Sequence, residues 1–315
     1  MNAIGGYFEL ELRQGEHYHK NALRLNSARN CFEYILLARE YKKVYIPYYT
    51  CEVLLQPLQR HGISYEFYSI NELLEPKEVI QLLPDEAYLY TNYFGLKQYC
   101  IERLAAIYRT QLIVDNAQAF FAPRIESIDT FYSPRKFWGV PDGGYLYTDC
   151  IINQELLQDK SYMRMQHLLQ RIDENAEKGY SSFRKNDDAL DNQPMRWMSK
   201  LTERLLCNID YDFSERRRRD NYLFLHKYLK GTNQLNIELQ SGEVPMAYLY
   251  MTDDTSLKQS LISNRIFVAT YWENVKEWVD KDSIEMGLVN NCLALPIDQR
   301  YGEMDMNVIV TNVLK

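Results

Sequence analysis

Apolar residues in the first half of the chain alternate between two spacings. Where they recur every three or four positions they predict helices, and where short apolar runs are nearly continuous they predict buried strands. Asn26 or Ser27 is the expected cap of the first helix, and Pro57 is expected to bend or shorten the second. The expected helices span residues 30–41, 51–60 and 98–108. The expected strands span residues 44–46, 63–70, 88–94, 112–114, 129–133 and 144–148.

The two halves of the chain differ in pattern. Helices that alternate with short apolar strands are typical of an α/β fold with a mostly parallel sheet flanked by helices. Residues 151–230 are polar and mostly helical in pattern, with a loop-like patch at 179–195, whereas the remainder mixes short strands and helices. We therefore expect a large α/β domain over residues 1–230, in which 151–230 is a helical connection, followed by a small C-terminal α+β lobe over 231–315.

Composition and charge narrow the class of protein. Of the 315 residues, 46% are hydrophobic and 25% are charged, and the net charge is -7. This is the mix of an ordinary globular protein, and the acidic balance argues against a broad nucleic-acid-binding surface. The basic run 216–219 lies in a helical pattern and is interpreted as a solvated helix face.

Targeting and metal-binding patterns are not found in the sequence. No apolar run is long enough to cross a bilayer, and no signal peptide is recognised, so no membrane partner is expected. The six cysteines form no C-x-x-C pair, which favours reduced thiols in a cytoplasmic protein. Of the five histidines only His17 and His19 are close together, and no metal site is expected.

The first candidate for chemistry is Asp115, which directly follows the apolar run 112–114. This position is the C-terminal end of an expected strand, and ligands of open parallel sheets bind at that edge. Taken alone, the carboxylate is better explained as the cap of a following helix. Gln118 favours the ligand site, because its side chain can contact a bound ring.

A second candidate is Lys136, which lies between aromatic residues just past the strand expected at 129–133. Apolar surroundings would desolvate its amine and favour the neutral, nucleophilic form. The alternative is an ordinary surface lysine on a hairpin. Gly143 and Gly144 follow, and two glycines allow a tight turn close to a ligand.

The third candidate is the segment that opens the first expected helix, Asn26-Ser27-Ala28-Arg29-Asn30. Free N–H groups at a helix start can bind phosphate, although every capped helix offers them. The chain lacks a Walker motif and a G-x-G-x-x-G turn, so a nucleotide or dinucleotide phosphate is not the expected ligand. The sequence leaves two orientations of Arg29: its guanidinium reaches the phosphate, or it points to solvent.

In their joint order these segments resemble the DegT/DnrJ/StrS sugar aminotransferases, fold type I enzymes that depend on pyridoxal 5′-phosphate (PLP). The resemblance extends from Asn26 to Asp149. Residues 113–119 (Ile-Val-Asp-Asn-Ala-Gln-Ala) are similar to the family's Asp-x-Ala-Gln segment, and Asn-Tyr-Phe-Gly at 92–95 is similar to its strand-end segment. Lys136 with the following Asp142-Gly143-Gly144 is similar to the family's lysine and its later acidic residue with two glycines. Leu-Pro-Ile at 295–297 is a looser match.

The resemblance implies an aspartate-aminotransferase-like fold and a role for each residue. Lys136 would form the Schiff base with PLP and later move the proton between two carbons. Asp115 would pair with the pyridinium nitrogen, and Gln118 would contact the side of the ring that carries the phenolic oxygen. The N–H groups of Ala28 and Arg29 would bind the phosphate.

Several positions depart from the family pattern. Ala28 and Arg29 stand where the family has glycine followed by threonine or serine, so a hydroxyl contact to phosphate is missing. Cys51 aligns with the aromatic residue that covers the ring, and Tyr49 or Tyr93 is the expected substitute.

Two more departures concern the lysine loop and the neighbouring subunit. The family's serine upstream of the lysine falls on Phe131, and Ser133 is a displaced candidate. The asparagine that the family takes from the other subunit has no clean match, and Arg184 and Asn186 in a loop expected at 179–190 are the candidates.

The resemblance implies a PLP-dependent aminotransferase. Its expected substrates are a nucleotide-activated keto-sugar and glutamate as amino donor, in polysaccharide or glycan biosynthesis, and a homodimer is expected. Lys136 argues against the dehydratases of the family, which carry histidine at this position. Two alternatives remain: a PLP enzyme that acts on a small amino acid, and a catalytically silent PLP-fold protein with a binding or regulatory role.

Overall fold

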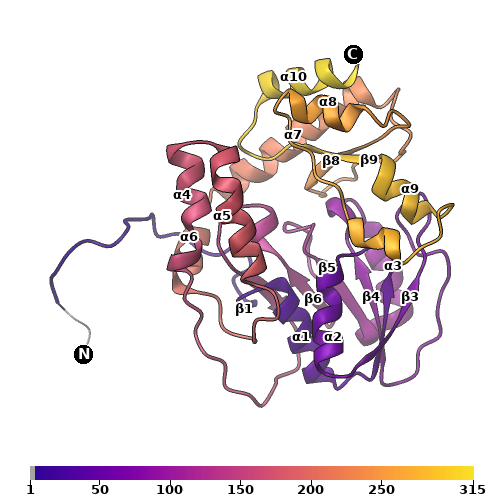
Figure 1. Ribbon diagram of the computed structural model, residues 1–315. Helices are drawn as coiled ribbons and strands as arrows, with labels where there is room; N and C mark the ends of the chain where they lie inside the picture. Colours follow the sequence, from indigo (N-terminus) through magenta and orange to yellow (C-terminus); the bar gives the residue numbers. More distant parts are fainter. Residues whose placement is uncertain (1–3) are drawn as a thin grey trace.

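The computed structural model describes residues 4–315, and its central feature is a seven-stranded sheet (Figure 1). The strand order is β1-β7-β6-β5-β4-β2-β3, with β7 antiparallel to both of its neighbours and every other pairing parallel. The expected mostly parallel sheet is therefore confirmed. The strands are β1 (Leu23–Leu25), β2 (Lys43–Pro47), β3 (Ser64–Tyr68), β4 (Glu86–Thr91), β5 (Leu112–Asn116), β6 (Asp129–Tyr132) and β7 (Gly144–Tyr147).

Helices cover both faces of this sheet, because its central strands are apolar on both sides. Along β5, Ile113 packs into the core beneath α1, whereas Leu112 and Val114 pack into the core on the opposite face. The helices of this part are α1 (Ala28–Arg39), α2 (Leu55–Arg60) and α3 (Gln98–Tyr108). Short 3₁₀ turns lie at η1 (Glu52–Leu54), η2 (Tyr93–Gly95), η3 (Arg109–Gln111), η4 (Pro134–Lys136), η5 (Tyr162–Arg164) and η6 (Glu273–Glu277).

Local sequence explains where two of these helices begin. The side chain of Ser27 accepts a hydrogen bond of 3.1 Å from the backbone N–H of Asn30, so Ser27 caps α1. The second expected helix is divided into η1 and α2. Pro57 consequently lies in the first turn of α2, where its missing N–H costs no helical hydrogen bond.

The segment after β7 is helical, and one expectation for it is wrong. Its helices are α4 (Gln166–Asp173), α5 (Ala176–Asp188), α6 (Lys200–Leu206) and α7 (Tyr211–Leu229). Residues 179–190, expected as a loop, mostly belong to α5, which Asn175 caps through the N–H of Lys178. In the sequence Gly179 suggests a loop, but the structure requires a small residue there because α4 passes close. A Cβ at position 179 would lie 3.1 Å from the carbonyl oxygen of His167.

The C-terminal part has the expected mixed α+β character and lies at the top of the view in Figure 1. Its two-stranded antiparallel sheet consists of β8 (Ala247–Met251) and β9 (Cys292–Pro296). Its helices are α8 (Leu257–Ser263), α9 (Ile284–Asn291) and α10 (Glu303–Val313). Helix α7 packs against α10 and β8, and the boundary at residues 230 and 231 stays a prediction. Within residues 4–315, no helix combines the length and apolarity needed for a bilayer span.

Candidate active site

Asp115 lies at the C-terminal end of β5, between Thr91 of β4 and Phe131 of β6. Its side chain is buried and accepts a hydrogen bond of 2.8 Å from the N–H of Ala117. A turn follows instead of a helix, so Asp115 is not a helix cap. Burial raises the pKa of its carboxyl, while the Lys136 ammonium and the Ala117 N–H act in the opposite direction. Asp115 lies on β5 and Lys136 follows the adjacent strand β6, so the two side chains come from neighbouring strand ends.

Gln118 is fully buried and half satisfied. Its Oε1 accepts a hydrogen bond of 3.1 Å from the N–H of Phe94, whereas its Nε2 has no partner among residues 4–315. An unpaired buried donor costs about 1–3 kcal/mol, which favours an acceptor from a ligand at this position. The nearby Gly95 has φ +75° and leaves no room for a Cβ, which would lie 2.6 Å from the carbonyl oxygen of Val244.

Lys136 ends the 3₁₀ turn that follows β6, and its side chain is exposed in the single chain. The expected desolvation by its sequence neighbours is therefore wrong, because Phe137 and Trp138 turn into the core and leave the lysine outside. Other rings approach its amine. Nζ lies 5.9 Å from the ring centre of Tyr271 and 5.8 Å from that of Trp272. These two aromatics come from the C-terminal part, and no sequence pattern near Lys136 predicts them.

The carbonyl group that follows Lys136 is held by the C-terminal part of the chain. The oxygen of Phe137 accepts hydrogen bonds from Gln299 Nε2 at 2.9 Å and from Arg218 at 3.3 Å. Arg218 is only 1% exposed, lies 4.4 Å over the Phe137 ring, and has its pKa lowered to about 10 by burial. The interpretation of 216–219 as a solvated face is thus wrong for this residue. Helical spacing places Arg218 on the buried face of α7. This spacing is missed when the four arginines are considered only as a run of charge.

The start of α1 resolves the question about Arg29. Its guanidinium donates hydrogen bonds to Gln56 Oε1 at 2.7 Å, to the carbonyl oxygen of Leu190 at 2.9 Å and to Asp191 Oδ1 at 2.9 Å. It therefore holds the segment after α5 and does not point to solvent. The first two helical N–H groups, of Ala28 and Arg29, have no acceptor inside the helix, as at any helix start.

The candidates for covering the cofactor ring gather near the lysine. The ring of Tyr49 is buried, with centroids 5.1 Å from Trp272 and 5.7 Å from Tyr93. The hydroxyl of Tyr93 donates a hydrogen bond of 2.9 Å to the carbonyl oxygen of Tyr49. Burial raises the pKa of the Cys51 thiol, and the Lys136 ammonium opposes this effect, so Cys51 also lies near the lysine. Ser133 is buried immediately before the turn that carries Lys136.

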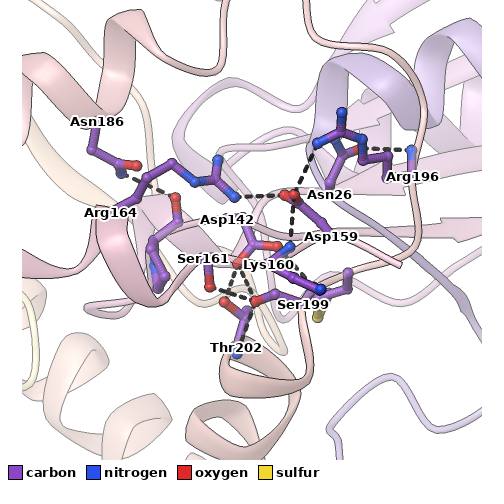
Figure 2. Close-up of polar contacts among 12 residues, drawn as sticks. Asn26, Asp142, Asp159, Lys160, Ser161, Arg164, Asn186, Arg196, Ser199 and Thr202 are labelled. Carbon is purple, nitrogen blue, oxygen red and sulfur yellow. Dashed lines mark hydrogen bonds and ion pairs between the residues drawn. The ribbon is translucent and has the colours of Figure 1, made fainter. Parts of the chain in front are cut away.

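The two residues expected to reach the active site of a second subunit, Arg184 and Asn186, lie on helix α5 and not in a loop. Arg184 is exposed, 3.9 Å from Asp188 of the same helix. Asn186 is buried, and its Nδ2 donates a hydrogen bond of 3.0 Å to the carbonyl oxygen of Pro141 in its own chain (Figure 2). Asp187 pairs with Arg135 at 3.0 Å. The end of α5 therefore supports the loop of Lys136 from within the same chain.

A cavity of about 600 Å³ lies apart from these residues, between the start of α3 and residues 236–243. Several of its charged lining residues are already paired. Lys97 Nζ lies 2.9 Å from Glu75, and Glu243 accepts the N–H of Gln98 at 3.1 Å. We therefore place the candidate site at Asp115 and Lys136 and not in this cavity.

No family model matches this chain, and no curated protein does. Solved structures do. A DegT DnrJ EryC1 StrS aminotransferase from Brucella abortus has a TM-score of 0.61 at 15% identity, over 93% of this chain and 85% of that one. DesV from S. venezuelae, solved with a ketimine intermediate, has a TM-score of 0.63 at 16% identity, over 93% and 83%. Spr1654 from Streptococcus pneumoniae in its PLP form has a TM-score of 0.64 at 13% identity, over 93% and 86%. The chain thus has the fold of these aminotransferases over nearly its whole length, as the resemblance predicted.

Proposed function

We propose that this protein is a PLP-dependent sugar aminotransferase. One observation carries the proposal: within the aminotransferase fold, a buried carboxylate and a primary amine from adjacent strand ends, Asp115 and Lys136, are electrostatic neighbours. PLP supplies an electron-accepting ring that carries amino groups between substrates. The residues described above fit such a ring, because its three polar regions each have a matching donor or acceptor.

Asp115 would face the ring nitrogen. A buried carboxylate with one backbone donor gains most from a cationic partner, and a protonated ring nitrogen is such a partner. The unpaired Nε2 of Gln118 would donate to the ring's phenolic oxygen. The N–H groups of Ala28 and Arg29 would bind the phosphate at the positive end of α1. Lys136 would hold the cofactor and move the proton, and the ring cover is assigned to Tyr49 or Tyr93 near Cys51.

The substrates follow from the resemblance together with the shared fold. We infer that a nucleotide-activated keto-sugar receives the amino group and that glutamate donates it, in the cytoplasmic synthesis of a polysaccharide or another glycan. Several solved structures of this fold are described as sugar aminotransferases, including CalS13 from Micromonospora echinospora, which supports a sugar as substrate.

We further infer a homodimer. Leu169 and Ile172 of α4 and Tyr180 and Phe183 of α5 are exposed, an apolar surface that a second copy would cover. The same helix pair supports the Lys136 loop through Asn186, so a dimer formed here would border the site.

A catalytically silent PLP-fold protein is the second candidate. The observation that favours it is the engagement of Arg29 by Asp191 and Leu190, together with the missing hydroxyl at residue 28 or 29. Such a protein would keep a cofactor or its fold without turning over a substrate.

The decisive experiment combines PLP binding with covalent trapping. Borohydride reduction of the PLP-loaded protein should fix the cofactor on Lys136, as located by peptide mass spectrometry, and glutamate added before reduction should convert it to the pyridoxamine form. Lys136→Ala should show neither effect, whereas Lys200→Ala, which removes an exposed lysine of α6, should behave like the wild type. Trapping on another lysine would refute the assignment. Trapping on Lys136 without conversion by glutamate would favour the silent protein.

A further inference from the structure

Asp142 is a fully buried carboxylate that no cation neutralises within residues 4–315 (Figure 2). Its Oδ2 accepts a hydrogen bond of 2.9 Å from the N–H of Ser199, and its Oδ1 accepts from the hydroxyls of Ser199, at 2.7 Å, and Thr202. These donors form the first turn of α6. The two arginines nearby in Figure 2, Arg164 and Arg196, pair with Asp159 instead.

The residues after Asp142 touch the start of α1. Gly143 has φ +119°, and its N–H donates a hydrogen bond of 2.8 Å to the carbonyl oxygen of Asn26. At Gly144 a Cβ would lie 2.5 Å from the carbonyl carbon and oxygen of Ser27 and 2.7 Å from the nitrogen of Ala28. The glycine turn therefore fits directly against the residues that begin the helix.

One short segment thus connects two helix starts. Asp142 binds the first turn of α6, and Gly143 and Gly144 support Ser27 and Ala28. A carboxylate that accepts three hydrogen bonds is held in one orientation, since each charge-assisted bond is stronger than a neutral one. That orientation determines how the following glycines meet α1.

We propose that Asp142 is a positioning residue for phosphate binding, acting through the glycine turn on the N–H groups of Ala28 and Arg29. This inference rests on the proposed function, because it takes the start of α1 as the phosphate site. No side-chain hydroxyl is present at residues 28 and 29, so the binding of phosphate depends on the placement of backbone donors. A fixed turn beneath those donors compensates for the missing hydroxyl.

Asp142→Asn tests the proposal. The carboxamide keeps the shape and one acceptor for the N–H of Ser199, but an NH₂ group replaces the oxygen that accepts from the hydroxyls of Ser199 and Thr202. Those two hydrogen bonds must reverse, and all three lose the charge of the carboxylate. The measured quantity is the ratio of the dissociation constants of pyridoxal and PLP, which differ only by the phosphate. We expect this ratio to fall about tenfold in Asp142→Asn, with pyridoxal affinity unchanged, a change of about 1.4 kcal/mol.

Two further variants separate positioning from general destabilisation. Asp129→Asn breaks another buried carboxylate, which pairs with Arg39 at 2.8 Å at the opposite end of β6, and it should lower the melting temperature without changing the ratio. Thr202→Val removes one hydroxyl donor to Asp142 and keeps the methyl group that borders Gly143. It should lower the ratio by less than Asp142→Asn does, and it decides the question if the aspartate variant does not fold.

The outcomes distinguish this inference from the proposed function. A wild-type ratio in both Asp142→Asn and Thr202→Val would overturn the positioning role, while PLP binding stood. If the wild type itself bound PLP no better than pyridoxal, the proposed phosphate site would be wrong. Hydrogen exchange at the Gly143 amide would then decide the coupling. Faster exchange in Thr202→Val than in Asp129→Asn would support it, and equal exchange would overturn it.

Discussion

We expect His19 to make the folded protein sensitive to acid, because of the contacts of its buried ring. The ring lies 4.1 Å from that of Tyr132 and 4.7 Å from that of Phe120, measured between centroids. Its Nε2 is 2.8 Å from the carbonyl oxygen of Phe120, and its Nδ1 is 3.3 Å from the hydroxyl of Tyr147. Since a carbonyl oxygen only accepts, Nε2 carries the proton and Nδ1 accepts from the tyrosine. The neutral ring satisfies both contacts.

The size of the effect follows from the pKa. Burial lowers the pKa of His19 from 6.5 to about 4, partly opposed by the Phe120 carbonyl. The unfolded chain therefore binds this proton more readily than the folded one. Stability is fully present above pH 6.5 and is lost as the pH falls toward 4. At pH 4.5 the expected loss is about 2.5 kcal/mol, because one pKa unit corresponds to about 1.4 kcal/mol.

Urea unfolding of the wild type and of His19→Gln at pH 7 and pH 4.5 measures this loss. Glutamine does not titrate and can still donate to the Phe120 carbonyl. The free energy of unfolding should fall by about 2.5 kcal/mol less in His19→Gln than in the wild type between the two pH values. Comparing each protein with itself removes the cost of the substitution at neutral pH. Equal losses in both proteins would refute the assignment of the neutral, buried ring.

Four other substitutions test the site and the assembly. Asp115→Asn should stabilise the PLP-free protein at pH 7 by about 1–3 kcal/mol, because it removes a buried charge, and should abolish transamination; a destabilised, active variant would show that the carboxylate is structural. Arg29→Ala should lower the free energy of unfolding by about 1–3 kcal/mol without weakening PLP binding. Ala28→Pro should weaken PLP binding and preserve the fold. Fluorescence titration with PLP distinguishes the two variants, and the reverse pattern would contradict the phosphate site. Ile172→Glu should convert a dimer to a monomer in light scattering, and an unchanged mass would exclude the α4–α5 surface.

The sheet could be predicted because its strands are apolar on both faces. Short continuous apolar runs such as 112–114, set between helical patterns, are typical of strands in a buried parallel sheet. The position of Asp115 followed from the same pattern, since the first polar residue after such a run lies at the sheet edge. The ends of the strands were less predictable. Strand β4 ends at Thr91 and not at the expected residue 94, because the chain turns into η2.

Features that depend on distant contacts were not predictable. Nothing near Lys136 in the chain announces Tyr271 and Trp272, which approach it only because the C-terminal part folds back over the sheet. Arg218 and its exposed neighbour Arg216 are the same residue type in the same run, and only packing separates them. The polar residues of α5 and Gly179 obscure the helical period, so the sequence pattern predicts a loop there.

The two hydrogen bonds to the Phe137 carbonyl come from residues that the ribosome adds long after Phe137 itself. The sheet, with Asp115 and Lys136, is complete in sequence by residue 147, but Gln299 is translated about half a chain later. Domains generally fold from the N-terminus while translation continues. In a nascent chain the loop of Lys136 would therefore first be supported by α5 alone, and the Phe137 carbonyl would gain its two donors only after Arg218 and Gln299 had been synthesised.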